Sequence, residues 1–470
     1  MSAATAVLPA LRRDAAGHAH VDYRAVWGIA GPLMVNSTVQ AVLNLTDTYF
    51  VSRLSTNATA AVGAVHWAIL CVVILLGGVG MATQTFAAQA FGGRRNARAA
   101  QAAWSGLYAA LLMTPVFILA GFLGGPYVHA LHLDPDTERM ALEFWWPRIV
   151  VAGPLGLGAW VLTGFFNGVG RTGVTLFVTA AMALANIPFN QLFIFDLHLG
   201  IAGSSWGTVA AQLVGVAIGL ALFLGPATRA RFRSHLCWRR PAIARQLRLG
   251  LPMGLATTAD LLGLALFQAM LVSLSTVAGA ATQIVMILTS VSYMPGVGIA
   301  IAGTTLVGQS IGAGDSAWAM RVGNAAIRLA VGFMGVVGVV LAAAGPWVLP
   351  LFVNAADPKA PAVIALGGTL LWMAACYQMF DGLNIGSGFC LRGAGDVKVP
   401  AILVGVLSFG LWVPLTHIVT FAPGGGWVHF LPALGYGAIG GWVVCVLYAI
   451  ALGLTLWLRW RSGAWRRIHL

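Results

Sequence analysis

Long apolar runs, separated by short charged or glycine-containing turns, make up most of the sequence. Runs of about 18 residues or more recur, and each can cross a hydrocarbon core about 30 Å thick. The runs do not alternate apolar with polar residues, so the pattern favours helices over a membrane β-barrel. The sequence therefore predicts an all-α polytopic membrane protein with twelve transmembrane helices. The predicted spans are 26–50, 62–90, 102–125, 141–166, 174–195, 200–224, 249–273, 281–311, 323–351, 362–390, 398–421 and 433–458.

The charges in the turns support an even number of spans. Acidic residues such as Asp134 and Asp136 gather on one side, whereas arginines such as Arg94, Arg95 and Arg98 gather on the other. Arginine and lysine concentrate on the cytoplasmic side of membranes. We therefore expect a multi-pass protein of the cell (inner) membrane with both termini in the cytoplasm. The net charge of +13 is explained by this orientation, and no nucleic-acid partner is expected.

The two halves of the sequence repeat each other. Pro32 and the motif 89–92 (Gln-Ala-Phe-Gly) correspond to Pro252 and the motif 309–312 (Gln-Ser-Ile-Gly), 220 residues later. Each half holds six spans and enters the membrane in the same orientation, so a pseudo-two-fold axis along the membrane normal is expected, with a site between the lobes near the midplane. The predicted parts are a cytoplasmic N-terminal segment (1–24), an N-terminal six-helix lobe (25–225), a basic cytoplasmic linker (226–248), a C-terminal six-helix lobe (249–458) and a cytoplasmic basic tail (459–470).

The linker mixes arginines with large apolar residues. This composition predicts an interfacial helix that is attracted to anionic headgroups. A regulatory or partner-binding role is the alternative.

Three acidic residues are predicted to lie well inside spans: Asp47, Asp260 and Asp381. An ionised Asp at the bilayer centre costs about 2.5–3.5 kcal/mol on insertion scales, and such residues are functional by default. A structural ion pair is the alternative interpretation, but no Lys or Arg is predicted to lie deep enough in a span to pair with them. The three acids are therefore predicted to bind an ion that the protein moves.

Other polar residues accompany the acids. Tyr377, Asp381 and Asn384 recur at spacings of four and three, so they share one helical face. Carboxylate, phenol and amide oxygens suit Na⁺, whereas desolvation and a neighbouring carboxylate suit a proton carrier; both interpretations stay open. Polar residues inside membrane helices also serve as interhelical hydrogen-bonding groups. Further candidate cleft residues are Asn36, Gln40, Asn44, Asn186, Asn190, Gln283 and Tyr293.

No motif in the sequence indicates an enzyme or a cofactor. The segment 435–440 matches the glycine pattern of dinucleotide-binding turns, but it opens a membrane helix with no strand before it. A P-loop is missing, which argues against direct use of ATP by this chain. We therefore expect no catalytic residue and no cofactor.

Several of these motifs together resemble the multidrug and toxic compound extrusion (MATE) transporters, and within them the NorM-like branch. They are the twelve spans, Pro32, Asp47 with Thr48, the motifs 89–92 and 309–312, and the turn Arg392-Gly393-Ala394-Gly395-Asp396. The resemblance extends from about residue 24 to 458. It implies two six-helix lobes around a central cleft that export organic cations or amphiphiles in antiport with Na⁺ or H⁺ by alternating access.

The resemblance also implies roles for individual residues. It implies a cation site in the C-terminal lobe, able to take Na⁺, from Asp260, Tyr377 and Asp381. In the N-terminal lobe it implies a cleft lined by Asp47, with Asn186 and Asn190. Position 260 is Asp where NorM-like members usually carry Glu, which shortens the reach of the side chain.

Two other function classes stay open. A flippase for lipid precursors or lipid-linked oligosaccharides has a similar architecture, but it favours basic residues in its cleft for a diphosphate, and the intramembrane acids argue against it. An intramembrane enzyme is the weaker alternative, since no paired nucleophile and base is present. The expected partners are small organic cations or amphiphilic drugs and the lipid bilayer, and the protein is expected to function as a monomer.

Overall fold

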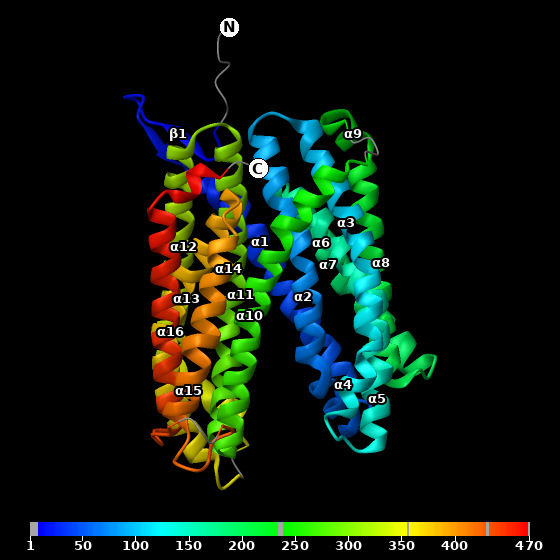
Figure 1. Ribbon diagram of the computed structural model, residues 1–470, viewed down its shortest axis with the longest axis vertical. Helices are drawn as coiled ribbons and strands as arrows, with labels where there is room; N and C mark the ends of the chain where they lie inside the picture. The colour runs from blue at the N-terminus through cyan, green and yellow to red at the C-terminus, as the bar shows by residue number, and fades with distance from the viewer. Residues whose placement is uncertain (1–7, 234–237, 355–356, 429–431, 469–470) are drawn as a thin grey trace.

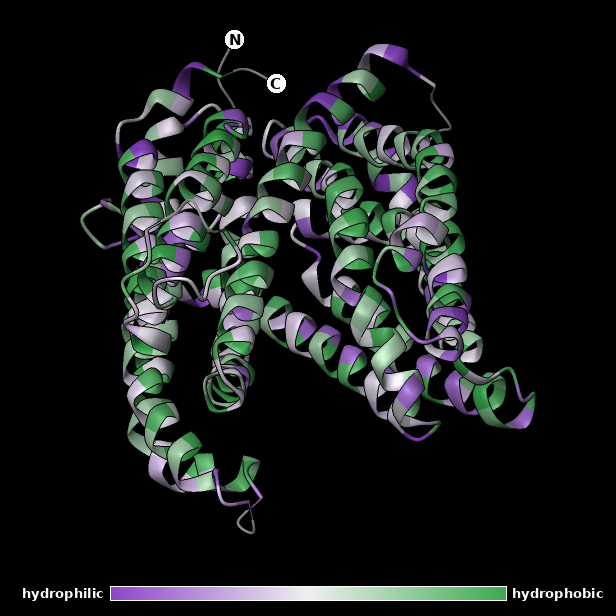
Figure 2. Cartoon of the chain, turned by 60° about the horizontal axis from the view of Figure 1, so that its bottom comes forward, coloured by the Kyte–Doolittle hydropathy of each residue, from purple (hydrophilic) through white to green (hydrophobic). Residues whose placement is uncertain are grey.

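The computed structural model describes residues 8–233, 238–354, 357–428 and 432–468, so parts of the predicted segments 1–24 and 226–248 and of the C-terminal tail lie outside the described residues. Twelve helical segments among the described residues are long and apolar enough to cross a membrane, which confirms the predicted fold class. They form two lobes that meet at one end of the molecule and diverge toward the other (Figure 1). Apolar residues predominate along the helices, and hydrophilic ones are frequent at their ends (Figure 2).

The N-terminal lobe contains α1 (Tyr23–Ser52), α2 (Thr56–Gly92), α3 (Asn96–Phe122), α4 (Gly124–His129), α5 (Pro135–Trp146), α6 (Gly153–Gly168), α7 (Thr172–Gln191), α8 (Gly200–Leu224) and α9 (Pro226–Phe232). The C-terminal lobe contains α10 (Arg240–Leu274), α11 (Thr276–Gly312), α12 (Ser316–Val348), α13 (Ala360–Ala394), α14 (Lys398–Leu407), α15 (Val413–Thr420) and α16 (Gly437–Arg461). Short π-helical segments lie at Pro147–Ala152, Leu192–Asp196 and Ser408–Trp412, and 3₁₀ turns at Leu349–Phe352 and Ala464–Arg467.

A short hairpin of β1 (Leu11–Arg13) and β2 (Ala19–Val21) precedes α1. It packs on the C-terminal lobe, where Trp318 Nε1 donates a hydrogen bond to Pro9 O at 2.8 Å. The sequence predicts no ordered element in this part of the chain, because the hairpin is stabilised by contacts with α12, which is distant in the sequence. The segment therefore belongs structurally to the opposite lobe.

The connection between the lobes differs from the prediction. α9 ends at Phe232 and α10 already begins at Arg240, so residues 240–248 are the first turns of a membrane helix and not part of a separate linker. Arginines at a helix end extend their charged groups toward the headgroups while the backbone stays helical. Because these charged residues interrupt the apolar pattern, the span predicted from the sequence begins only after them, at residue 249.

Equivalent serines begin a long helix in each lobe. Ser55 Oγ accepts a hydrogen bond from Ala58 N at 3.0 Å, and Ser275 Oγ accepts one from Ala278 N at 3.0 Å. Each serine satisfies one of the N–H groups that a helix start leaves without a partner. The same cap 220 residues apart agrees with the internal repeat.

The lobes contact each other through hydrogen bonds that also follow the repeat. Gln89 Nε2 donates to Gly393 O at 3.0 Å, and Gln309 Nε2 donates to Gly168 O at 2.9 Å. Gln89 and Gln309 are equivalent residues of the two repeated motifs, and each bond ends on a glycine that begins a Gly-X-Gly sequence, residues 168–170 in one lobe and 393–395 in the other. Each lobe therefore gives the other the same bond, at the end of the molecule where α2 and α11 end.

A second pair of bonds and two close approaches extend this contact. Thr85 Oγ1 donates to Arg392 O, and Thr305 Oγ1 donates to Asn167 O, both at 3.0 Å. A Cβ on Gly92 or on its counterpart in the other lobe, at position 312, would lie only 1.9 Å from a backbone carbonyl oxygen of the opposite lobe. We call these reciprocal contacts, made by residues 85–92 and 305–312, the lobe junction.

Candidate functional site

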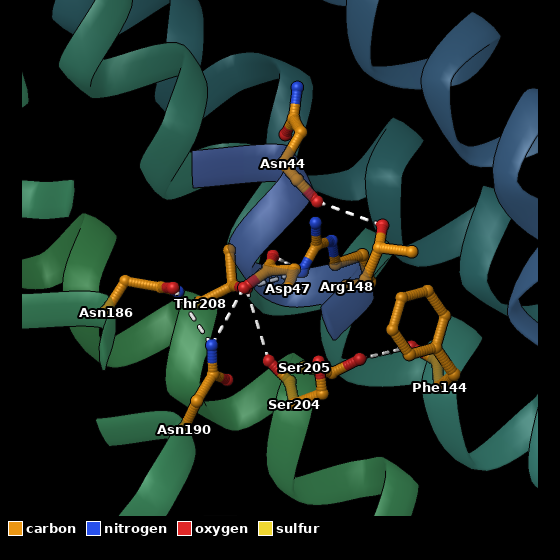
Figure 3. A network of polar contacts seen from close by, with 10 residues as sticks. Asn44, Asp47, Phe144, Arg148, Asn186, Asn190, Ser204, Ser205 and Thr208 are labelled. Atoms are coloured by element: carbon orange, nitrogen blue, oxygen red, sulfur yellow. Dashed lines mark hydrogen bonds and ion pairs between the residues drawn. The ribbon is translucent and has the colours of Figure 1, made fainter. Parts of the chain in front are cut away.

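Asp47 of α1 lies at the centre of a polar network in the N-terminal lobe (Figure 3). The residue is 6% exposed, and its Oδ2 forms an ion pair with Arg148 Nη1 at 3.1 Å. Thr208 Oγ1 donates to the same oxygen at 3.0 Å, and Asn190 Nδ2 donates to Oδ1 at 2.9 Å. Asn190 Nδ2 also lies 2.9 Å from Asn186 Oδ1. Both carboxylate oxygens of Asp47 therefore have protein partners.

The ion pair corrects one sequence prediction. No base was expected to pair with an intramembrane acid, yet Arg148 pairs with Asp47. The arginine lies in the π-helical segment Pro147–Ala152 between α5 and α6 and also contacts Thr208. Asp47 lies between one and two turns before the end of α1, so the two side chains meet toward that end of the helix. Arg148 was the one arginine within the predicted span 141–166, and that fact could have identified it.

Asp381 of α13 has a different environment. It is 5% exposed, and its Oδ1 accepts a hydrogen bond from Asn384 Nδ2 at 3.1 Å. Its Oδ2 is buried and forms no hydrogen bond with any of the described residues. Among the described residues, no Lys, Arg or His lies within ion-pairing distance of Asp381. One oxygen of this carboxylate is therefore free to take a cation or a proton.

Asp260 of α10 lies nearby and is held by a hydroxyl group. Tyr448 OH donates to Asp260 Oδ1 at 2.6 Å and also hydrogen-bonds Ser408 Oγ at 2.7 Å. The ring of Tyr448 stacks on Trp412 with centroids 4.3 Å apart. Ser408 and Trp412 both belong to a π-helical segment, a distortion that often marks functional sites. Tyr448 is a site residue that the sequence did not indicate, since it is one of many aromatic residues in apolar runs.

Four of the predicted residues come together in the C-terminal lobe. Asp260 and Asp381 interact electrostatically with each other and with the phenols of Tyr293 and Tyr377. α11 packs against both α10 and α13, the helices that carry the two acids. Arg392 also acts electrostatically on Asp260, although no ion pair of 4 Å or less joins the two. The predicted site of Asp260, Tyr377 and Asp381 is thus a spatial cluster, which stays a candidate site.

Arg392 contacts both lobes. Its Nη2 donates to Thr257 Oγ1 of α10 at 2.9 Å, and its Nη1 lies 3.7 Å from Met81 Sδ of α2. Its guanidinium also lies over the ring of Phe389, 4.4 Å from the centroid. Arg392 begins the turn that is one of the motifs of the family resemblance, and the residue is half-buried between the lobes.

The remaining predicted cleft residues are dispersed. Gln40 and Asn44 of α1 and Gln283 of α11 are exposed in the protein without lipid, whereas Asn36 is buried and its Oδ1 has no partner. No group of three or more His, Cys, Asp or Glu side chains that could hold a metal ion occurs among the described residues. An ion at the Asp260 and Asp381 cluster would therefore rely on two carboxylates together with neutral oxygens.

Comparison with known proteins decides the family. The MatE family profile matches residues 32–192 and 252–418, one block in each lobe. The chain belongs to the MatE family. The predicted resemblance is thereby confirmed. MatE proteins are transporters, so this chain is a multi-pass membrane transporter and not an enzyme.

Curated relatives agree over nearly the full length. The chain is 31% identical to the probable multidrug resistance protein NorM of Pseudomonas aeruginosa, with 94% of this chain and 90% of the relative covered. It is 26% identical to the probable NorM of Rhizobium meliloti, with 93% and 92% covered.

Solved structures show the same fold at low sequence identity. An outward-facing multidrug resistance MATE family transporter of the MOP superfamily matches with a TM-score of 0.81 at 19% identity and covers 93% of this chain and 94% of its own. A crystal structure of MATE in complex with MaL6 also matches with a TM-score of 0.81 at 19% identity, covering 93% and 95%.

Proposed function

We propose that this protein is a secondary active multidrug efflux transporter that exports organic cations or amphiphiles in antiport with Na⁺ or H⁺. The names of the NorM relatives support the substrate class. The observation that carries the coupling is the free, buried Oδ2 of Asp381 beside Asp260. A buried carboxylate without a base is stabilised when it binds a cation or a proton. The membrane gradient supplies such an ion.

The two carboxylates favour one ion at a time. Because the charges of Asp260 and Asp381 repel each other, binding of one Na⁺ or one proton between them relieves the repulsion. A sodium ion takes Asp381 Oδ2, Asp260 and the phenol oxygen of Tyr377 as ligands, whereas a proton needs only Asp381. Both ions suit the cluster, and the experiment below distinguishes them.

The lobe junction defines the side from which the ion and substrate are reached. The junction lies at the end of the molecule where the arginines Arg95, Arg98 and Arg171 lie, which the positive-inside bias assigns to the cytoplasm together with both termini. The lobes diverge toward the other end (Figure 1). In the proposed cycle, this arrangement admits the coupling ion from outside, and the junction breaks when the lobes rock to accept substrate from the cytoplasm.

The energetics permit this cycle. One charge moving down 100 mV releases about 2.3 kcal/mol. Since about 1.4 kcal/mol corresponds to a tenfold concentration ratio, the ion sustains roughly fortyfold accumulation. The flippase alternative favours basic residues at the transport site for a diphosphate, whereas the cluster there is built around two carboxylates, Asp260 and Asp381. One copy of the chain contains both lobes and the cluster, which supports function as a monomer.

Efflux of a fluorescent organic cation from proteoliposomes tests the proposal. The gradients of Na⁺ and of protons are imposed one at a time, with a third set of vesicles that has neither. We expect uphill movement with at least one gradient and only equilibration without either. The variant Asp136→Asn, which removes an exposed charge in the first turn of α5, serves as the matched control and should behave like the wild type. Equal transport in all three sets of vesicles would refute ion coupling.

A further inference from the structure

A cavity of about 860 Å³ lies at the end of the molecule that carries the lobe junction, away from the acidic cluster. Its walls come from the last turns of α2 and α11, the first turns of α3, residues 238–246, which lead into and begin α10, and Ile468. The transport site uses none of these walls except where the cavity touches Gln89 and Gly312 of the junction. The cavity therefore needs its own explanation.

Five arginines face this cavity, and no acidic residue is among its described lining residues. They are Arg95, Arg98, Arg239, Arg240 and Arg245. Among the described residues, no carboxylate forms an ion pair with any of the five. Like charges gathered around one space repel one another, and a bound anion relieves that repulsion. Guanidinium groups bind phosphate oxygens with two parallel hydrogen bonds, which a spherical anion does not match.

A buried hydroxyl group also lines the cavity. Ser105 is 2% exposed, and in the part of the chain that the structure describes its Oγ has no hydrogen-bond partner. Arg98, Gln101 and Ser105 follow each other along α3 at spacings of three and four residues, so they share one helical face. A buried hydroxyl group without a partner is unfavourable. An acceptor oxygen of a bound anion supplies the missing partner.

The walls are held in place by specific contacts. The ring of Trp238 packs edge-on against Tyr108 of α3, with centroids 4.7 Å apart. The side chain of Gln246 is buried and donates to Val79 O at 2.9 Å and to Thr83 Oγ1, which fixes the start of α10 to α2. The basic groups of α3 and α10 therefore face the same space because the fold positions them there.

We propose that this cavity is a binding site for a phosphate-bearing anion, and specifically for the headgroup of an anionic phospholipid. Basic pockets between membrane helices on the cytoplasmic side bind such headgroups. Trp238 is exposed beside the arginines, and tryptophan favours the depth at which headgroups lie. Because Gln89 and Gly312 also line the cavity, an occupant touches both sides of the lobe junction and stabilises the arrangement in which that junction is closed.

Lipid binding to the purified full-length chain tests the site. The protein is reconstituted in phosphatidylcholine nanodiscs with increasing amounts of cardiolipin, and bound lipid is counted by native mass spectrometry beside the thermal unfolding midpoint. We expect cardiolipin to be retained and to raise the midpoint. The triple variant Arg95→Gln, Arg98→Gln and Arg245→Gln should weaken the binding about tenfold or more.

Three exposed arginines outside the cavity provide a matched control. The triple variant Arg171→Gln, Arg229→Gln and Arg248→Gln removes the same charge and should keep the binding within about twofold of the wild type. Ser105→Ala leaves the charge unchanged and should weaken the binding about threefold or more, because only a site that uses the hydroxyl group depends on it. Equal losses in both triple variants, with none in Ser105→Ala, would overturn the proposal.

A second arm identifies the source of the phosphate group. Inorganic phosphate is titrated into protein in nanodiscs of phosphatidylcholine alone, and the unfolding midpoint is recorded for the same variants. Cavity-dependent stabilisation by phosphate without any by cardiolipin would support the anion site but overturn its assignment to lipid. If neither probe binds in a way that the cavity variants weaken, the site itself is refuted.

Discussion

The two lobes share one fold, but the intramembrane acids of the two lobes have opposite environments. In the N-terminal lobe, Asp47 has Arg148, Thr208 and Asn190 as partners, so both oxygens are satisfied. In the C-terminal lobe, one buried oxygen of Asp381 has no hydrogen-bond partner among the residues that the structure describes. The lobe junction, by contrast, is built from the same contacts on both sides. The repeat therefore conserves the surfaces where the lobes meet but not the chemistry inside them.

This difference indicates that the acids of the two lobes have different roles. A buried ion pair is neutral as a whole and holds the elements that carry it, although it adds little net stability compared with apolar packing. The energy of a buried carboxylate without a basic partner changes whenever an ion binds to it or leaves it. We therefore infer that the N-terminal lobe is a stable frame and that the C-terminal lobe responds to the ion. The following predictions test that contrast.

The largest expected effect is that of Asp381→Asn. The amide keeps the size of the side chain but removes the charge that the coupling ion needs, so gradient-driven efflux should fall by at least about tenfold, a loss of about 1.4 kcal/mol or more of coupling. Insertion and the unfolding midpoint should not fall, because no ion pair is lost. Efflux in proteoliposomes and thermal unfolding in detergent measure the two. Unchanged efflux would remove Asp381 from the ion site.

In the N-terminal lobe, removing the basic partner of the acid should lower the free energy of unfolding. Arg148→Gln leaves the Asp47 charge buried without its partner, and breaking such a pair costs about 3–5 kcal/mol when both groups are fully buried. Because the Arg148 side chain is 19% exposed, we expect about 2–3 kcal/mol, seen as a lower unfolding midpoint. The double variant Asp47→Asn with Arg148→Gln should recover more than half of that loss. A double variant as unstable as the single one would mean that the pair is not what Arg148 provides.

The sequence predicted the fold better than the site. Apolar runs and turn charges depend on local composition, so the twelve spans and the repeat followed from them. Tyr377, Asp381 and Asn384 could be grouped because helical spacing is also local. Arg148 and Tyr448 were missed because their partners lie about 100 or more residues away, and only tertiary packing brings them together. The half-buried position of Arg392 likewise depends on contacts with α2 and α10, which local patterns do not predict.

The lobe junction is made of equivalent contacts from the two lobes. We therefore expect equivalent substitutions in it to have equal effects, in contrast to substitutions of the acids. Gln89→Leu and Gln309→Leu each remove one bond between the lobes, worth about 1 kcal/mol. Each should shift the population toward an open junction by a similar factor, about fivefold. Distances between spin labels at the starts of α3 and α12 report that population. Gln191→Leu, at the exposed last residue of α7 and outside the junction, is the matched control and should change nothing.

If the two junction variants differ strongly, the symmetry of the contacts does not extend to their energies. One lobe would then hold the junction closed, and the contrast between frame and responsive lobe would apply to this surface too.

The smallest expected effect separates the two acids of the C-terminal lobe. Tyr448→Phe keeps the ring that stacks on Trp412 but removes the hydroxyl group that donates to Asp260 at 2.6 Å. The loss of one such bond is worth about 1–2 kcal/mol. If Asp260 assists Asp381 in binding the ion, the ion concentration for half-maximal efflux should change about fivefold while the maximal rate stays the same. Tyr436→Phe, at an exposed tyrosine before α16, is the control for the loss of a hydroxyl group.

The outcome shows whether Asp260 is an acid with fixed partners, like Asp47, or an acid that takes part in ion binding, like Asp381. No change in ion dependence would show that Asp260, like Asp47, is a fixed structural acid held by its partners. A loss of efflux as large as that of Asp381→Asn would instead make the hydroxyl group of Tyr448 part of the ion site, because its bond to Asp260 would then be as necessary as the free oxygen of Asp381. The expected result, a changed ion dependence with an unchanged maximal rate, fits a role for Asp260 in which its charge adjusts the ion affinity while Asp381 binds the ion.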